Sequence, residues 1–130
     1  MSRTTISFLL AATVYFTAGI MLGVVFQVAE PTRVLRPVHA HINLVGFMTF
    51  FVIGVAYHII PRFRGRPLIS ERLGMAQFLL ANIGLLGMLF LTALDAYGAL
   101  AGLTYLMALF GAILAGSLLI FVYYMARTLI

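Results

Sequence analysis

The side chains best suited to chemistry in this sequence are its three histidines, and all of them fall in one apolar stretch. His39 and His41 lie near the start of the stretch, and His58 lies near its end. Ionisable side chains are costly at membrane depth and usually have a function there. An imidazole nitrogen binds haem iron or copper. The pattern therefore favours metal or haem binding by His39 and His41.

The spacing of this pair limits what it can bind. On an α-helix, residues two positions apart point about 200° away from each other, so His39 and His41 cannot hold one iron from its two sides. Each must serve a different site or meet a partner from another chain. The alternative is a pair of hydrogen-bonded interfacial histidines, and this is the interpretation we favour for His58, just before Pro61 and Arg62.

The composition predicts the elements that position these histidines. The chain of 130 residues is 64% hydrophobic and 8% charged, which excludes a water-soluble globular protein. It has no Cys, which excludes disulfides, thiolate metal sites and iron–sulfur clusters. Four apolar stretches are each long enough to cross a bilayer as a helix. We predict one all-α domain, 1–130, a four-helix transmembrane bundle with helices at about 5–29, 38–60, 72–94 and 98–126.

The arginines indicate the orientation of this bundle. All eight basic residues are Arg and they lie at the ends of apolar stretches, a pattern that favours membrane topology over nucleic-acid binding. Arg33 and Arg36 fall on one side of the membrane, and the larger group falls on the other side, together with both termini. The positive-inside rule then puts both termini in the cytoplasm. The larger group is Arg3, Arg62, Arg64, Arg66, Arg72 and Arg127.

Small and amide side chains predict how the helices pack. The short turn near Asp95 makes the last two helices antiparallel neighbours. Gln77 and Asn82 are expected to bridge to a neighbouring helix. Small residues spaced by four let helices approach closely, within the chain in preference to between protomers. The sets are Gly19 and Gly23, Gly98 and Gly102, and Ala108, Ala112 and Gly116.

Four ordered motifs surround the histidines: His39-x-His41, Leu44-x-Gly46-Phe47, Gly54-x-x-Tyr57 and Pro61-Arg62-x-x-Gly65. This series resembles the catalytic subunit of the haem–copper oxidases, in the branch of the C-type cytochrome oxidases and nitric oxide reductases. The resemblance covers the second apolar stretch and the connection after it. It implies a protein of the prokaryotic cytoplasmic membrane.

The resemblance also implies roles for individual residues. His39 corresponds to the proximal ligand of the high-spin haem, and His41 corresponds to an axial ligand of the low-spin haem. Arg33 and Arg36 lie at the end where that family pairs Arg with haem propionates. Their alternative role is ordinary snorkelling to lipid headgroups. Since the chain has no Cys for covalent attachment, the implied cofactor is haem b.

The chain departs from the family in size and in ligands. It resembles a single arc of four helices out of twelve, and it lacks the further metal ligands, so we do not expect a complete oxygen or NO reductase. We predict a dimer or trimer in which His41 of one protomer faces His39 or His41 of the next across a haem. The function would be electron transfer or binding of NO or O₂, with an unspecified redox partner or quinone. The alternatives are a copper-binding protein and a cofactor-free accessory or assembly subunit of a respiratory oxidase.

Overall fold

The computed structural model describes residues 1–65, 70–99 and 102–130, and these form helices and turns without a strand. Each of the four helical spans is long and apolar enough to cross a membrane. A helix of 26 residues is about 39 Å long, against a hydrocarbon core of about 30 Å. The predicted all-α, four-helix fold is therefore confirmed. The spans are α1 (Arg3–Val28), a composite span (Glu30–Phe63), α4 (Glu71–Ala96) and α5 (Thr104–Leu129).

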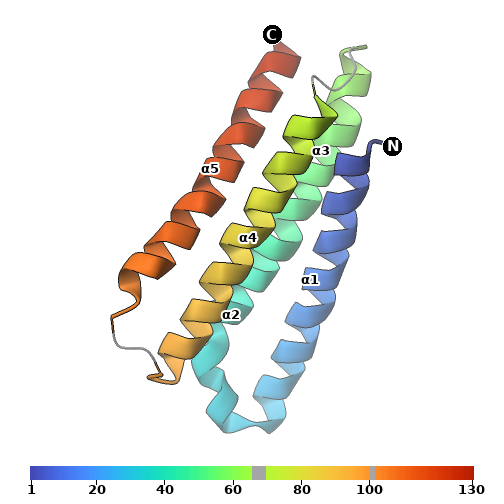
Figure 1. Cartoon of the computed structure of the whole chain (residues 1–130). Coiled ribbons are helices and arrows are strands. Elements are labelled where there is room, and N and C mark those ends of the chain that lie inside the picture. Colours follow the sequence, from blue (N-terminus) through green and yellow to red (C-terminus); the bar gives the residue numbers. More distant parts are fainter. Residues whose placement is uncertain (66–69, 100–101) are drawn as a thin grey trace.

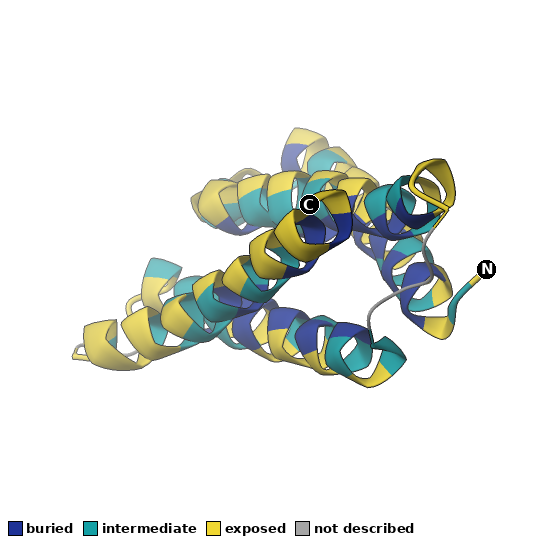
Figure 2. Cartoon of the chain, turned by 90° about the horizontal axis from the view of Figure 1, so that it is seen from above, coloured by how far each residue is buried: buried dark blue, intermediate teal, exposed yellow. Residues whose placement is uncertain are grey.

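The spans run up and down, so both termini lie at the same end of the bundle (Figure 1). We call this the terminal end, and the other the loop end. The most extensive helix contacts are those of α4 with α5 and of α1 with the composite span. The last two helices are therefore antiparallel neighbours, as predicted. Buried residues gather where helices face one another, and α5 is largely exposed (Figure 2).

The composite span is not one regular helix. It begins with a 3-10 helix, η1 (Glu30–Leu35), and continues as α2 (Arg36–His41), a π-helix, η2 (Ile42–Thr49), and α3 (Phe50–Phe63). Pro37 lies in the first turn of α2, where its missing N–H costs nothing. Pro61 lies inside α3 and is buried. Helical structure thus extends at both ends beyond the 38–60 predicted from the sequence.

Two serines set the starts of α1 and α4. Ser2 Oγ accepts the N–H of Thr5 at 3.1 Å, and Ser70 Oγ accepts the N–H of Leu73 at 3.2 Å. Such caps satisfy an N–H that has no partner within its helix and stabilise it by about 0.5–2 kcal/mol. Both helices consequently begin slightly earlier than the predicted positions 5 and 72.

The start of α5 and the role of its preceding glycines differ from the prediction. We expected this helix from 98 and read Gly98 and Gly102 as a packing motif. Both glycines instead have positive φ, 69° and 103°, and α5 begins at Thr104. Left-handed backbone is readily accessible to glycine, so these two residues shape the turn. The expected helical residues 100–101 lie outside the described residues.

Other glycines do bring helices together. A Cβ on Gly19 would lie 2.4 Å from Asn43 Oδ1, and one on Gly84 would lie 2.6 Å from the backbone N of Leu114. Gly19 and Gly23 therefore pack α1 against the composite span, as predicted. The third predicted set does not pack within the described part of the chain. Ala108 and Ala112 are exposed, and a Cβ on Gly116 would meet nothing within 4 Å.

The core consists of packed aromatic rings and contains a few interhelical hydrogen bonds. Phe8 and Tyr57 are buried, with Tyr57 packing edge-on to Tyr124 at 5.0 Å between ring centroids. The Tyr57 hydroxyl donates to Gln77 Oε1 at 2.8 Å. The Tyr15 hydroxyl likewise donates to Asn82 Oδ1 at 2.9 Å. The predicted bridging role of both amides is confirmed.

Candidate functional site

His39 lies in the contact between α2 and α1. Its ring packs edge-on to Phe26, with 5.3 Å between ring centroids, and its Cε1 lies 3.2 Å from where a Cβ on Gly23 would be. The Asn43 amide nitrogen lies 3.3 Å from each ring nitrogen, and it donates to the His39 carbonyl at 2.8 Å. Glycine at position 23 thus makes room for this ring. His39 is engaged within the chain.

His41 has a different environment. Its Nδ1 lies 2.8 Å from the carbonyl oxygen of Pro37, one turn earlier. Because a carbonyl oxygen only accepts, this contact assigns the proton to Nδ1 and leaves a lone pair on Nε2. Metal-binding histidines are typically oriented in this way, with the second ring nitrogen donating to a carbonyl.

The His41 ring lines a surface hollow of about 140 Å³. The other lining residues are Ala40, Leu44 and Val45, so its wall is almost entirely apolar. Leu44 is 64% exposed, which places the hollow on the outside of the bundle. His39 contacts α1 while His41 faces outward, and the predicted opposite-face arrangement is therefore confirmed.

The π-helix begins directly after His41. The Thr49 hydroxyl donates to the carbonyl of Leu44, five residues earlier, at 2.8 Å. Gly46, within the same segment, meets the Tyr15 ring: a Cβ there would lie 2.5 Å from its Cγ. π-helical turns are rare and are frequent at functional sites. The sequence did not predict this segment, because a π-helix of eight residues within a longer apolar stretch leaves no separate hydrophobic pattern.

Asn43 is the site residue for which we assigned no role from the sequence. Its amide holds His39 and fills the space above Gly19. The spacing could have predicted this contact, because an amide four residues after a histidine lies on the same face of a helix. Pro37 stands in the same relation to His41. Both histidines are thus fixed by neighbours one turn away.

The two arginines at this end of the bundle differ in their contacts. Arg33 Nη1 pairs with Glu30 Oε1 at 2.8 Å, and its Nε donates to the carbonyl of Phe26 at 3.2 Å, at the end of α1. Arg33 is therefore tied to the loop. The Arg36 side chain is exposed and has no hydrogen bond or ion pair among the described residues. Of the two, Arg36 is the one whose guanidinium needs no rearrangement to meet an anionic group.

His58 is apart from this site, near the terminal end. Its Nε2 accepts a hydrogen bond from Arg62 Nη1 at 2.9 Å, one turn later on α3. This contact agrees with the hydrogen-bonded interfacial interpretation. Over the described ranges, no three His, Cys, Asp or Glu side chains come together as a metal site.

Comparison with known proteins adds no relative. No protein-family model matches the chain, and neither a curated protein nor a solved structure matches it. The functional argument consequently rests on the residues and their geometry.

Proposed function

We propose that this chain is a small integral-membrane haem b protein that holds its haem between protomers, with His41 as an iron ligand. Its function would be electron transfer or the binding of a diatomic gas such as NO or O₂. The observation that carries the proposal is the hydrogen bond from His41 Nδ1 to the Pro37 carbonyl, because it leaves the Nε2 lone pair available to bind iron.

The hollow beside His41 supports a site shared between chains. Pockets that enclose an organic ligand of drug size measure about 300–1,000 Å³. The hollow of about 140 Å³ is too small to enclose a haem by itself. Its apolar wall suits the face of a porphyrin ring. A second copy of the chain would supply the opposite wall and, through its own His41, a second ligand.

His39 is less suited than His41 to bind the haem iron. Its ring nitrogens lie beside the Asn43 amide, and the ring lies against α1 at Gly23 and Phe26. We therefore assign His39 to packing that positions α2, and we favour His41 over His39 as the ligand from the neighbouring protomer. We propose that exposed Arg36 pairs with the haem propionates, since its guanidinium has no partner among the described residues.

Bound haem b would supply an iron that cycles between two oxidation states and, with one axial position open, binds a gas. Two axial histidines saturate the iron and favour electron transfer. A carbon monoxide difference spectrum of the reduced protein separates the two roles. A large, rapid spectral shift indicates an open or weakly held position, and no shift indicates two firmly held histidines.

The proposed location is a prokaryotic cytoplasmic membrane with both termini in the cytoplasm. The described arginines support this orientation, because most of them lie at the terminal end of the bundle. Arg66, which belongs to the same group in the sequence, lies outside the described residues.

Replacement of single histidines tests the ligand assignment. We expect His41→Ala to lose most of its haem, measured as pyridine haemochrome per mole of purified protein. His58→Ala is the matched control, because it removes an imidazole from the same span but away from the hollow, and it should retain haem. Equal haem content in wild type and His41→Ala would contradict the assignment.

A further inference from the structure

The last helix has its rotation fixed near the terminal end. Tyr124 is fully buried, and its hydroxyl accepts the N–H of Ser70 at 2.8 Å and donates to the Ser70 carbonyl at 3.1 Å. Arg64 also donates a hydrogen bond to the carbonyl of Leu129. These contacts tie α5 to the start of α4 and the end of α3. With Tyr124 turned inward, the adjacent Tyr123 is turned outward.

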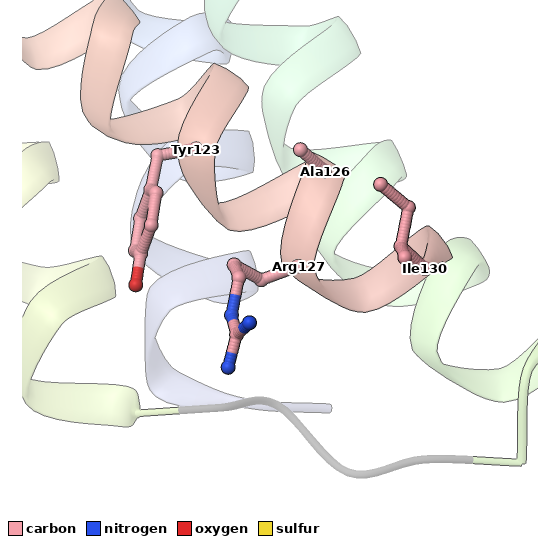
Figure 3. A pocket seen from close by; sticks show the side chains of 4 residues that line it. All are labelled: Tyr123, Ala126, Arg127 and Ile130. Carbon is pink, nitrogen blue, oxygen red and sulfur yellow. The ribbon is translucent and has the colours of Figure 1, made fainter.

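This outward face of α5 carries a surface hollow. It has a volume of about 320 Å³ and is lined by Tyr123, Ala126, Arg127 and Ile130. Tyr123 and Arg127 are four residues apart and project side by side from the helix (Figure 3). The hollow thus combines a guanidinium and a phenol with two apolar side chains.

Positive side chains outnumber negative ones at this end of the described chain. Glu71 is the acidic side chain at this end of the described chain, and its Oε1 already accepts the N–H of Thr4 at 2.6 Å and the Thr4 hydroxyl at 2.9 Å. The Arg127 side chain has no hydrogen bond or ion pair among the described residues. The arginines that the structure describes at this end are Arg3, Arg62, Arg64, Arg72 and Arg127.

An apolar surface continues from the hollow into the membrane-spanning part of α5. Leu119, one turn before Tyr123, is 68% exposed, and a Cβ on Gly116 would meet nothing within 4 Å. Phospholipids present the matching order of groups, with a phosphate at the interface and acyl chains below it. Arg binds phosphate with two parallel hydrogen bonds, and Tyr is enriched at the interface.

We propose that the Tyr123–Arg127 hollow is a binding site for an anionic phospholipid. Arg127 pairs with the phosphate, the Tyr123 hydroxyl donates to it, and an acyl chain lies along Leu119. The rest of the headgroup lies toward the other arginines at this end of the bundle. This inference is independent of haem and concerns the opposite end of the molecule from His41.

Native mass spectrometry of the detergent-purified protein tests the site. The protein is mixed with phosphatidylglycerol or with phosphatidylcholine, and the lipid that stays bound is counted. We expect phosphatidylglycerol to be retained about tenfold better, because both lipids carry the phosphate but the choline cation of phosphatidylcholine is repelled by the arginines at this end. Arg127→Gln should lose this preference, and Tyr123→Phe should weaken it.

Arg72→Gln is the matched control. It removes the same charge from the same end of the bundle, and Arg72 has no partner among the described residues and does not line the hollow. Helical content and melting temperature check that each variant is folded. An equal loss of binding in Arg72→Gln would overturn the site in favour of the general positive field.

Two further outcomes would also overturn the proposal. Equal retention of phosphatidylcholine would show that the hollow does not recognise charge. Complete displacement of phosphatidylglycerol by an excess of inorganic phosphate would show a site for free phosphate in place of a lipid. Retention that resists phosphate and depends on Arg127 supports the lipid site.

Discussion

At the scale of residues, His39 and His41 differ most in what their ring nitrogens contact. His41 is oriented by a carbonyl one turn earlier on its own helix, so its geometry depends only on local structure. The helical repeat was enough to predict that the two rings point apart. The contact of His39 with Gly23 was not predictable, because it depends on how α1 approaches, whereas the Asn43 contact follows from the four-residue spacing.

The buried Tyr57–Gln77 hydrogen bond leads to a prediction at the same scale. Tyr57→Phe removes the hydroxyl that donates to Gln77 Oε1, in a fully buried contact where Gln77 Nε2 has no partner among the described residues. We expect the free energy of unfolding to fall by about 0.6–1.7 kcal/mol, the range for interhelical hydrogen bonds in membranes. Unfolding by titration with a denaturing detergent measures it.

A second substitution serves as its control. Gln77→Leu in the Tyr57→Phe background removes the remaining buried amide, so the double variant should recover much of the loss. A double variant less stable than Tyr57→Phe would contradict the prediction, because the Gln77 amide would then have another hydrogen-bond partner.

At the scale of elements, the π-helix and the glycine contacts set how close the spans come. The extents of α1 and α4 were predictable to within a few residues, because long apolar runs end at polar caps. The late start of α5 was not predicted, because Gly98 and Gly102 fit a packing motif as well as a turn, and only backbone φ separates the two. The π-helix η2 likewise has no pattern that sequence periodicity detects.

The contact of α4 with α5 is tested by adding one methyl group. In Gly84→Ala the new Cβ would lie 2.6 Å from the Leu114 backbone N, so the helices must move apart. We expect a loss of about 1–3 kcal/mol in unfolding free energy, as for other overpacked sites. Gly111→Ala, where a Cβ meets nothing within 4 Å, should be neutral or slightly stabilising. Equal effects in the two variants would contradict the packing described.

At the scale of the whole molecule, the proposed haem site requires a second copy of the chain. The hollow at His41 lies on the outer surface, and the exposed side chains around it include Ala40 and Leu44. Because the chain has no Cys, single cysteines can be introduced without background. We expect Leu44→Cys protomers to be joined in membranes by a short bifunctional thiol cross-linker, since Leu44 of the two copies would lie on opposite sides of the same haem.

Leu119→Cys is the control for this cross-linking. Leu119 is as exposed as Leu44 but lies on α5, away from the proposed interface, so it should cross-link far less. A short cross-linker joins only thiols that are held close together, so the result reports a specific interface. Equal cross-linking at both positions would indicate random collision.

Haem binding by His41 is tested by the absorption spectrum of the purified protein, oxidised and reduced, after expression with a supply of haem precursor. We expect a Soret band and a pyridine haemochrome of haem b in the wild type, and loss of most of both in His41→Ala. A wild-type protein that is folded and carries no Soret band, or a band unchanged in His41→Ala, would contradict it.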